Sequence, residues 1–285
     1  MRSIDGMHRF CYDIVMNTKR INPVIWQITN IIAVVAVIVM NFVSTSLPLN
    51  GRSVQEISDA LPSYFTPAPY TFAIWGLIYL ALAGFGVYQA LPAQRERPFL
   101  ARIGWLFALS SVFNIAWLFA WHYGVYLLSI LMMAGLLLTL IAIYLRLNIG
   151  RRSAELSTSD KLFYQVPFSL YLGWITVATI ANVSSVVNYY GWNGFGVAEP
   201  IWSAIMMGVA VIVAGLLLFN RRSLAYAGVL VWALFGIRAA FPNVEVVANT
   251  AVVAAGLVVV LALVGYWRTG QQLETTLSSS SPRTA

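Results

Sequence analysis

Residues 103–145 read IGWLFALSSVFNIAWLFAWHYGVYLLSILMMAGLLLTLIAIYL and contain no Asp, Glu, Lys or Arg. Arg102 and Arg146 close the stretch at its two ends. A helix needs about 20 apolar residues to cross about 30 Å of hydrocarbon, so the stretch has roughly the length of two crossings. It therefore predicts a helical hairpin in a membrane, with its turn near residues 121–124.

The whole chain is rich in hydrophobic residues and poor in charged ones. Of its 285 residues, 60% are hydrophobic and 9% are charged, whereas soluble domains carry about 25% charged residues. The formal net charge is +7, but the basic residues stand singly and in pairs between apolar runs, which is typical of membrane loops. We expect the lipid bilayer as a partner and no nucleic acid. Because Cys11 is the one cysteine, an intrachain disulfide and a cysteine metal site are excluded.

The remaining charges divide the chain into further apolar stretches of membrane-spanning length. Together with the hairpin they predict an all-α integral membrane protein of about eight transmembrane helices. The first stretch is too long for the 7–15-residue core of a signal peptide, so we expect it to be retained. The spans outside the hairpin are expected near residues 24–47, 69–91, 162–188, 199–221, 224–240 and 246–267.

Basic residues indicate the orientation. All but two of the 17 lysines and arginines fall on one side of this arrangement, and only Arg52 and Arg238 fall on the other. Basic loops stay in the cytoplasm, so we expect both termini to be cytoplasmic and the protein to lie in the plasma (inner) membrane. Residues 1–23 would form a cytoplasmic N-terminal tail. Residues 268–285, which are polar and rich in serine, would form a disordered C-terminal tail.

The predicted spans carry aromatic and amide side chains but no acid or base at their centres. This argues against an ion-coupled pump and against hydrolytic chemistry, so no catalytic residue and no metal ligand is predicted. Helical spacing places the polar and aromatic residues on shared faces. Two interpretations stay open: the residues join helices to one another, or they line a cavity for a flat apolar ligand. The candidates are Phe72, Trp75, Tyr79, Asn114, Trp117, Tyr171, Trp174, Ala178 and Asn182.

Three of these segments resemble motifs of the TspO/MBR family, also called tryptophan-rich sensory protein, translocator protein or peripheral-type benzodiazepine receptor. They are FAIWGLIYL at 72–80, NIAWLF at 114–119 and YLGWITVATIAN at 171–182, similar to motifs of the family's second, third and fifth helices. The resemblance covers residues 24–188. Family members normally have five helices, so residues 189–267 would be an added unit of three helices. Leu170 stands where the family has a proline, and the loop before the second span lacks tryptophan.

The resemblance implies a ligand pocket inside the five-helix bundle, at which Trp75, Asn114, Trp174, Ala178 and Asn182 match family positions. It favours a membrane receptor or sensor that binds a tetrapyrrole (porphyrin) or similar apolar ligand and regulates its handling or transport. No cofactor is expected, although a tetrapyrrole would be a ligand. The alternatives are a permease for a small organic solute and photo-oxidation of a bound porphyrin, an activity reported for some members.

The resemblance also suggests a homodimer, because family members often dimerise. Gly104 and Ala108 are four residues apart in the third predicted span. Small residues at this spacing allow two helices to approach closely. Packing of the same residues within one chain is the alternative.

Overall fold

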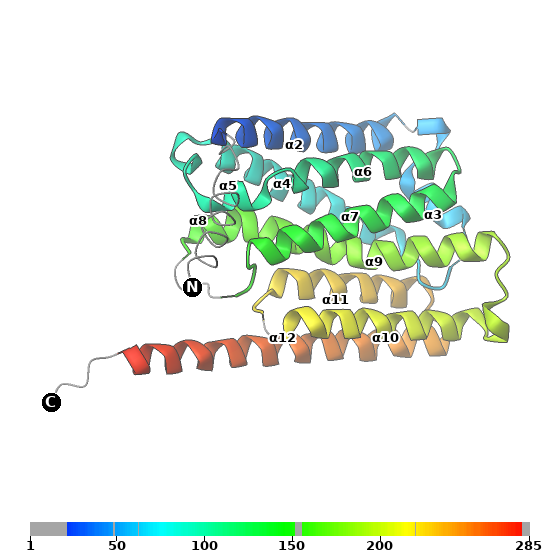
Figure 1. Cartoon of the computed structure of the whole chain (residues 1–285). Helices are drawn as coiled ribbons and strands as arrows, with labels where there is room; N and C mark the ends of the chain where they lie inside the picture. Colours follow the sequence, from blue (N-terminus) through cyan, green and yellow to red (C-terminus); the bar gives the residue numbers. More distant parts are fainter. Residues whose placement is uncertain (1–21, 48, 62, 152–155, 220, 281–285) are drawn as a thin grey trace, which may run out of the picture.

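The computed structural model describes residues 22–280, apart from 48, 62, 152–155 and 220. The predicted N-terminal tail lies almost wholly outside the described residues. All regular elements in the described part are helices (Figure 1), which confirms the all-α fold. The eight longest are α2 (Pro23–Ser46), α4 (Ile74–Ala90), α6 (Leu106–His122), α7 (Tyr126–Arg146), α9 (Val166–Tyr189), α10 (Glu199–Leu218), α11 (Leu224–Ala240) and α12 (Glu245–Ser280).

Six helical segments in the described part are long and apolar enough to cross a membrane. The protein is therefore an integral membrane protein in contact with lipid. The two remaining apolar helices, α6 and α11, have 17 residues each. They occupy the third and seventh predicted spans, so the count of eight crossings stays a prediction for these two helices.

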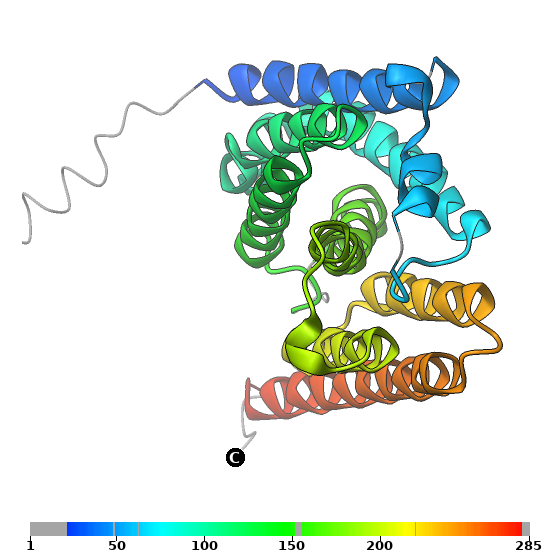
Figure 2. The same ribbon diagram turned by 90° about the vertical axis from the view of Figure 1, so that its right-hand side faces the viewer.

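The helix α9 is the centre of the arrangement (Figure 2). It is the most buried of the six long segments. On one side of it lie α2, α4, α6 and α7, and on the other lie α10, α11 and α12. Gly173 allows α11 to come close, since a Cβ atom there would lie 3.1 Å from the Tyr226 carbonyl oxygen and from Val229 Cβ.

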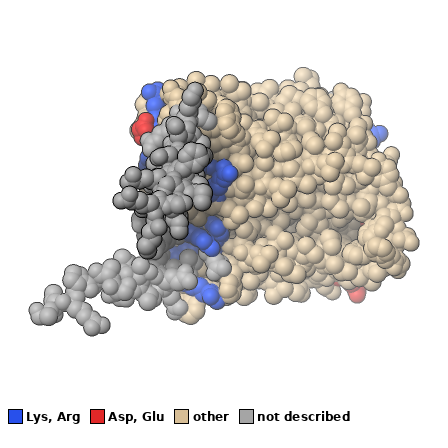
Figure 3. Space-filling model, viewed as in Figure 1, with Lys and Arg blue, Asp and Glu red and all other residues tan. Residues whose placement is uncertain are grey.

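Short elements connect the long helices at both ends of the bundle. At the end that carries residues 47–73 they are η1 (Leu49–Gly51), α3 (Val54–Ala60) and η2 (Pro69–Ala73), joined farther along the chain by η5 (Gly194–Gly196). At the opposite end they are η3 (Pro92–Gln94), α5 (Pro98–Ile103), α8 (Thr158–Asp160) and the π-helix η4 (Lys161–Gln165). Lys and Arg side chains gather at this second end (Figure 3), which we call the basic end; the other is the far end.

An ion pair joins two connectors at the basic end. Arg97 Nη2 lies 2.7 Å from Asp160 Oδ2, and the Tyr88 hydroxyl donates to Asp160 Oδ1 at 2.8 Å. Asp160 is buried, and its ordinary hydration is replaced by these two donors. The end of α4 is thereby fixed to the start of the α8–α9 segment.

The structure differs from the sequence expectations at two places. Gly104 ends α5 with φ +50° and is not part of α6, so Gly104 and Ala108 do not form a small-residue pair on one continuous helix. In addition, α12 continues to Ser280, into the segment 268–285 that the sequence favours as disordered. Gly270 is the only glycine or proline in residues 266–280, and a single glycine costs a helix only about 1 kcal/mol.

Candidate ligand pocket

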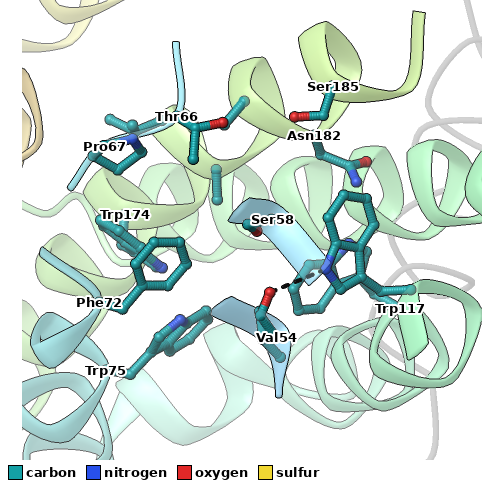
Figure 4. A pocket seen from close by; sticks show the side chains of 14 residues that line it. Val54, Ser58, Thr66, Pro67, Phe72, Trp75, Trp117, Trp174, Asn182 and Ser185 are labelled. Carbon is teal, nitrogen blue, oxygen red and sulfur yellow. Dashed lines mark hydrogen bonds between the residues drawn. The ribbon is translucent and has the colours of Figure 1, made fainter. Parts of the chain in front are cut away.

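The predicted aromatic faces meet in a pocket at the far end of the bundle (Figure 4). Its walls come from α4, α6 and α9, and the segment 54–67 covers it. The open space inside is about 40 Å³, enough for only a few water molecules. The lining residues are Val54, Ser58, Thr66, Pro67, Phe72, Trp75, Trp117, Trp121, Trp174, Val177, Ala178, Ala181, Asn182 and Ser185.

Six of the nine residues predicted from the sequence line this pocket, namely Phe72, Trp75, Trp117, Trp174, Ala178 and Asn182. The other three do not. Tyr79 stacks on Trp75, with ring centroids 5.3 Å apart. Tyr171 is buried and meets the edge of Trp75 at 6.1 Å. Asn114 is turned toward α2. Tyr79 and Tyr171 therefore support the Trp75 ring from outside the pocket lining.

Aromatic contacts fix the rings of the wall. The Trp174 ring meets Phe72 at 5.8 Å and Trp75 at 6.0 Å, both edge to face. On the opposite wall, Trp117 and Trp121 stack at 6.0 Å. Edge-to-face and offset-stacked pairs are the favourable geometries for aromatic rings. The pocket is thus a slot between preorganised rings on three helices.

The two buried amides among the candidates, Asn114 and Asn182, each form a hydrogen bond to another helix. Asn114 Oδ1 accepts from Asn41 Nδ2 of α2 at 2.8 Å. Asn182 Nδ2 donates to Ser129 Oγ of α7 at 3.1 Å. Asn114 thus joins two helices, whereas Asn182 joins two helices and also lines the pocket.

Several polar atoms of the pocket have no hydrogen-bond partner within the described part of the chain. They include the indole N–H groups of Trp117 and Trp174 and the hydroxyl of Thr66. Buried donors are normally paired, and leaving one unpaired costs about 1–3 kcal/mol. The pocket therefore offers donors to a ligand with acceptor atoms.

Two hydrogen bonds join the start of the cover and the residues just before it to the end of α6. Trp121 Nε1 donates to the Val54 carbonyl oxygen at 3.4 Å, and Asn50 Nδ2 donates to the His122 carbonyl oxygen at 3.0 Å. The start of α3 is a capping box, in which Ser53 N–H donates to the Glu56 carboxylate at 2.6 Å. This backbone hydrogen bond, followed by that of the Ser53 hydroxyl and the charge of Arg52, lowers the pKa of Glu56.

The helix α11 holds the other end of the cover. Ala68 N–H donates to the Gly236 carbonyl oxygen at 3.0 Å, and Trp232 Nε1 donates to the Thr71 carbonyl oxygen at 3.0 Å. The last three helices therefore reach the pocket through η2, a contact that spacing within single helices could not reveal.

Some pocket residues were missed although the sequence carries a signal for them. Ala181 and Ser185 lie seven and eleven positions after Trp174, so extending the helical period of that face would have included both. Trp121 was predicted only as part of the hairpin turn at residues 121–124, and it lines the pocket itself. Val54, Ser58 and Pro67 carry no periodic signal, because they lie in the cover.

A family comparison identifies the chain. The family model described as TSPO-like protein matches residues 27–264. The chain belongs to this family. The TSPO-like match extends past residue 188, where the resemblance in the sequence motifs ended, and runs through α10, α11 and most of α12. Comparison with curated proteins and with solved structures gives no match.

Proposed function

We propose that the protein is a membrane receptor that binds a tetrapyrrole or a similar flat, apolar ligand in the pocket between α4, α6 and α9 and regulates its handling. The observation that carries this proposal is the set of preorganised rings with unpaired indole donors at Trp117 and Trp174. Apolar walls with a few convergent polar groups are typical of small-molecule sites. Membership of the TSPO-like family supports the same assignment.

The volume of the pocket sets a condition on binding. A tetrapyrrole is far larger than 40 Å³, so the ligand needs the cover to move outward. The segment 54–67 covers the pocket and is therefore the element that would move, which requires release of its hydrogen bonds to Trp121 and, at Tyr64, to Ser203. Loops that close over ligands commonly move in this way. The proposal thus includes an open state of the cover.

Titration of the purified full-length protein with protoporphyrin, followed by quenching of tryptophan fluorescence, tests this proposal. Ala178→Leu would fill the slot, and we expect it to weaken binding at least about tenfold, the equivalent of about 1.4 kcal/mol. Trp174→Phe keeps a ring but removes the indole donor, and we expect a loss of about 1 kcal/mol, or about fivefold.

The matched controls are Ala204→Leu on α10 and Trp267→Phe on α12, which lie outside the pocket lining. Both should leave the affinity unchanged. Equal affinities of the Ala178→Leu and Ala204→Leu variants would refute the assignment of the pocket, and absence of quenching in the unaltered protein would refute a porphyrin as ligand.

A further inference from the structure

A second cavity lies at the far end of the bundle and shares no lining residue with the ligand pocket. Its volume is about 730 Å³, within the range of about 300–1,000 Å³ found for small-molecule sites. The walls come from the first turns of α7, the end of α9, the η5 loop and the start of α10, with residues 63–65 behind them. None of the nine residues predicted from the sequence lines this cavity.

Aromatic rings make up much of the wall. Tyr64, Tyr190, Trp192 and Trp202 all line the cavity. The rings of Trp192 and Trp202 are 5.2 Å apart and tilted by 49°. The face of an aromatic ring carries negative charge density and attracts cations within about 6 Å.

One carboxylate accompanies these rings. Glu199 is the only charged residue among those that line the cavity in the described part of the chain. Asn188 Nδ2 donates to Glu199 Oε1 at 2.6 Å and fixes the carboxylate in place. The second oxygen, Oε2, has no hydrogen bond within the described residues. The cavity therefore combines one negative charge with several ring faces and contains no Lys or Arg.

Two donors of the wall are used within the protein itself. Trp202 Nε1 donates to the Gly194 carbonyl oxygen at 2.8 Å, and Ser203 Oγ donates to the Tyr64 carbonyl oxygen at 2.8 Å. Gly194 has φ +61°, and a Cβ atom there would lie 2.9 Å from Trp202 Nε1, so glycine permits the close approach of the indole. The cavity offers a ligand several ring faces and the Glu199 carboxylate, beside the smaller polar groups of Ser63, Ser184 and Asn193.

We propose that this cavity binds a substituted ammonium ion, either a free organic cation or the headgroup of a membrane lipid. A methylated ammonium carries its charge on a bulky apolar surface, which fits ring faces, and it needs only one counter-charge, which Glu199 supplies. An anion would face an uncompensated carboxylate. The site is distinct from the proposed tetrapyrrole pocket and does not depend on it.

Calorimetric titration of the full-length protein in nanodiscs with choline tests the proposal. Its uncharged isostere, 3,3-dimethylbutan-1-ol, has the same shape without the charge. Because ring faces and a counter-ion attract the charge of choline and not its neutral isostere, we expect the isostere to bind at least about tenfold more weakly. Glu199→Gln should weaken choline binding by a similar factor.

The matched control is Glu245→Gln, which removes the carboxylate in the first turn of α12 and does not alter the cavity lining. It should leave choline binding unchanged. Trp192, which is 40% exposed, can be replaced without disturbing the core. We expect Trp192→Leu to weaken binding severalfold and Trp192→Phe to restore most of the loss.

Two lipids without net charge, of which only one carries an ammonium group, distinguish the sources of the ligand. Equal affinities in phosphatidylcholine and in galactolipid nanodiscs would indicate a free cation, whereas weaker binding in phosphatidylcholine would indicate competition by the lipid headgroup. The proposal is overturned if choline binds in neither lipid, if its isostere binds equally well, or if Glu199→Gln and Glu245→Gln behave alike.

Discussion

The amide pair of Asn41 and Asn114 shows how a polar residue acts inside this bundle. Both side chains are buried, and their hydrogen bond of 2.8 Å connects α2 to α6. We expect Asn41→Ala and Asn114→Ala each to lower the thermal stability in detergent. A double-mutant cycle should give a coupling of about 0.6 kcal/mol, with about 1.7 kcal/mol as an upper value for such bonds in membranes.

Porphyrin affinity separates this structural role from a role in binding. Because Asn114 does not line the pocket, Asn114→Ala should leave porphyrin quenching nearly unchanged at a temperature where the variant is folded. Additive losses of stability in the double variant would contradict the pairing. A large loss of porphyrin affinity in Asn114→Ala would show that this residue takes part in ligand binding.

Residue spacing predicted which side chains share a helix face, but not how each face is rotated in the bundle. Asn114 and Trp117 are three positions apart and were expected to act together. In the structure Trp117 lines the pocket while Asn114 meets Asn41 of another helix. The rotation depends on packing between helices, and Asn41 had no partner that spacing within α2 could indicate. Trp174 and Ala178, four positions apart on α9, do line the pocket together.

At the scale of elements, we predict that the stability of helix α3 in the cover depends on pH. The Ser53 backbone N–H holds the pKa of Glu56 below its ordinary value, so the ionised form stabilises the start of α3. This stabilisation is complete above the ordinary carboxylate pKa of about 4.3 and is lost as the pH falls through the lower pKa of the folded protein. We expect hydrogen exchange in residues 54–60 to accelerate below about pH 4 relative to the intrinsic rate.

The variant Glu56→Gln provides the control for this pH effect, because its amide does not titrate. Protection of α3 in Glu56→Gln should be lower than in the unaltered protein at neutral pH and should stay constant as the pH falls. A parallel pH profile in the two proteins would show that another group controls α3. Faster exchange in α3 at low pH should also speed porphyrin entry, if the cover is the route.

Long elements were easier to predict from the sequence than short ones. Charged residues ended each apolar run, so the hairpin of α6 and α7 and the start of α10 at Glu199 were predicted correctly. The helix α3 was missed although Ser53 and Glu56 have the spacing of a capping box. The contact of η2 with α11 joins residues far apart in the chain, so local sequence patterns cannot predict it.

The whole molecule has two parts that share α9. We propose that residues 24–188 bind the ligand and that residues 189–267 hold the cover from behind, through the bonds from α11 to η2. The family match across both parts indicates that they belong to one unit. From the bias of basic residues we further propose that the basic end lies in the cytoplasm. This orientation would open the second cavity, beside Trp192 and Glu199, toward the exterior.

This topology depends on whether α6 and α11 each cross the membrane. Each has 17 residues, about 25 Å of helix against about 30 Å of hydrocarbon. A short span can be accommodated by local thinning of the bilayer and by snorkelling of flanking residues such as Arg238. We therefore expect both helices to cross. Single cysteines placed after them, in a Cys11→Ser background, test this with a membrane-impermeant maleimide.

Tyr123→Cys follows α6 and Asn243→Cys follows α11, and both positions are exposed. With eight crossings, both cysteines should react in intact cells, whereas Arg151→Cys at the basic end should react only after permeabilisation. Protection of Tyr123→Cys in intact cells would show that α6 does not cross the membrane. Protection of Asn243→Cys would show the same for α11. Labelling of Arg151→Cys in intact cells would show that the protein has the opposite orientation. The second cavity would then take its ammonium ligand from the cytoplasm.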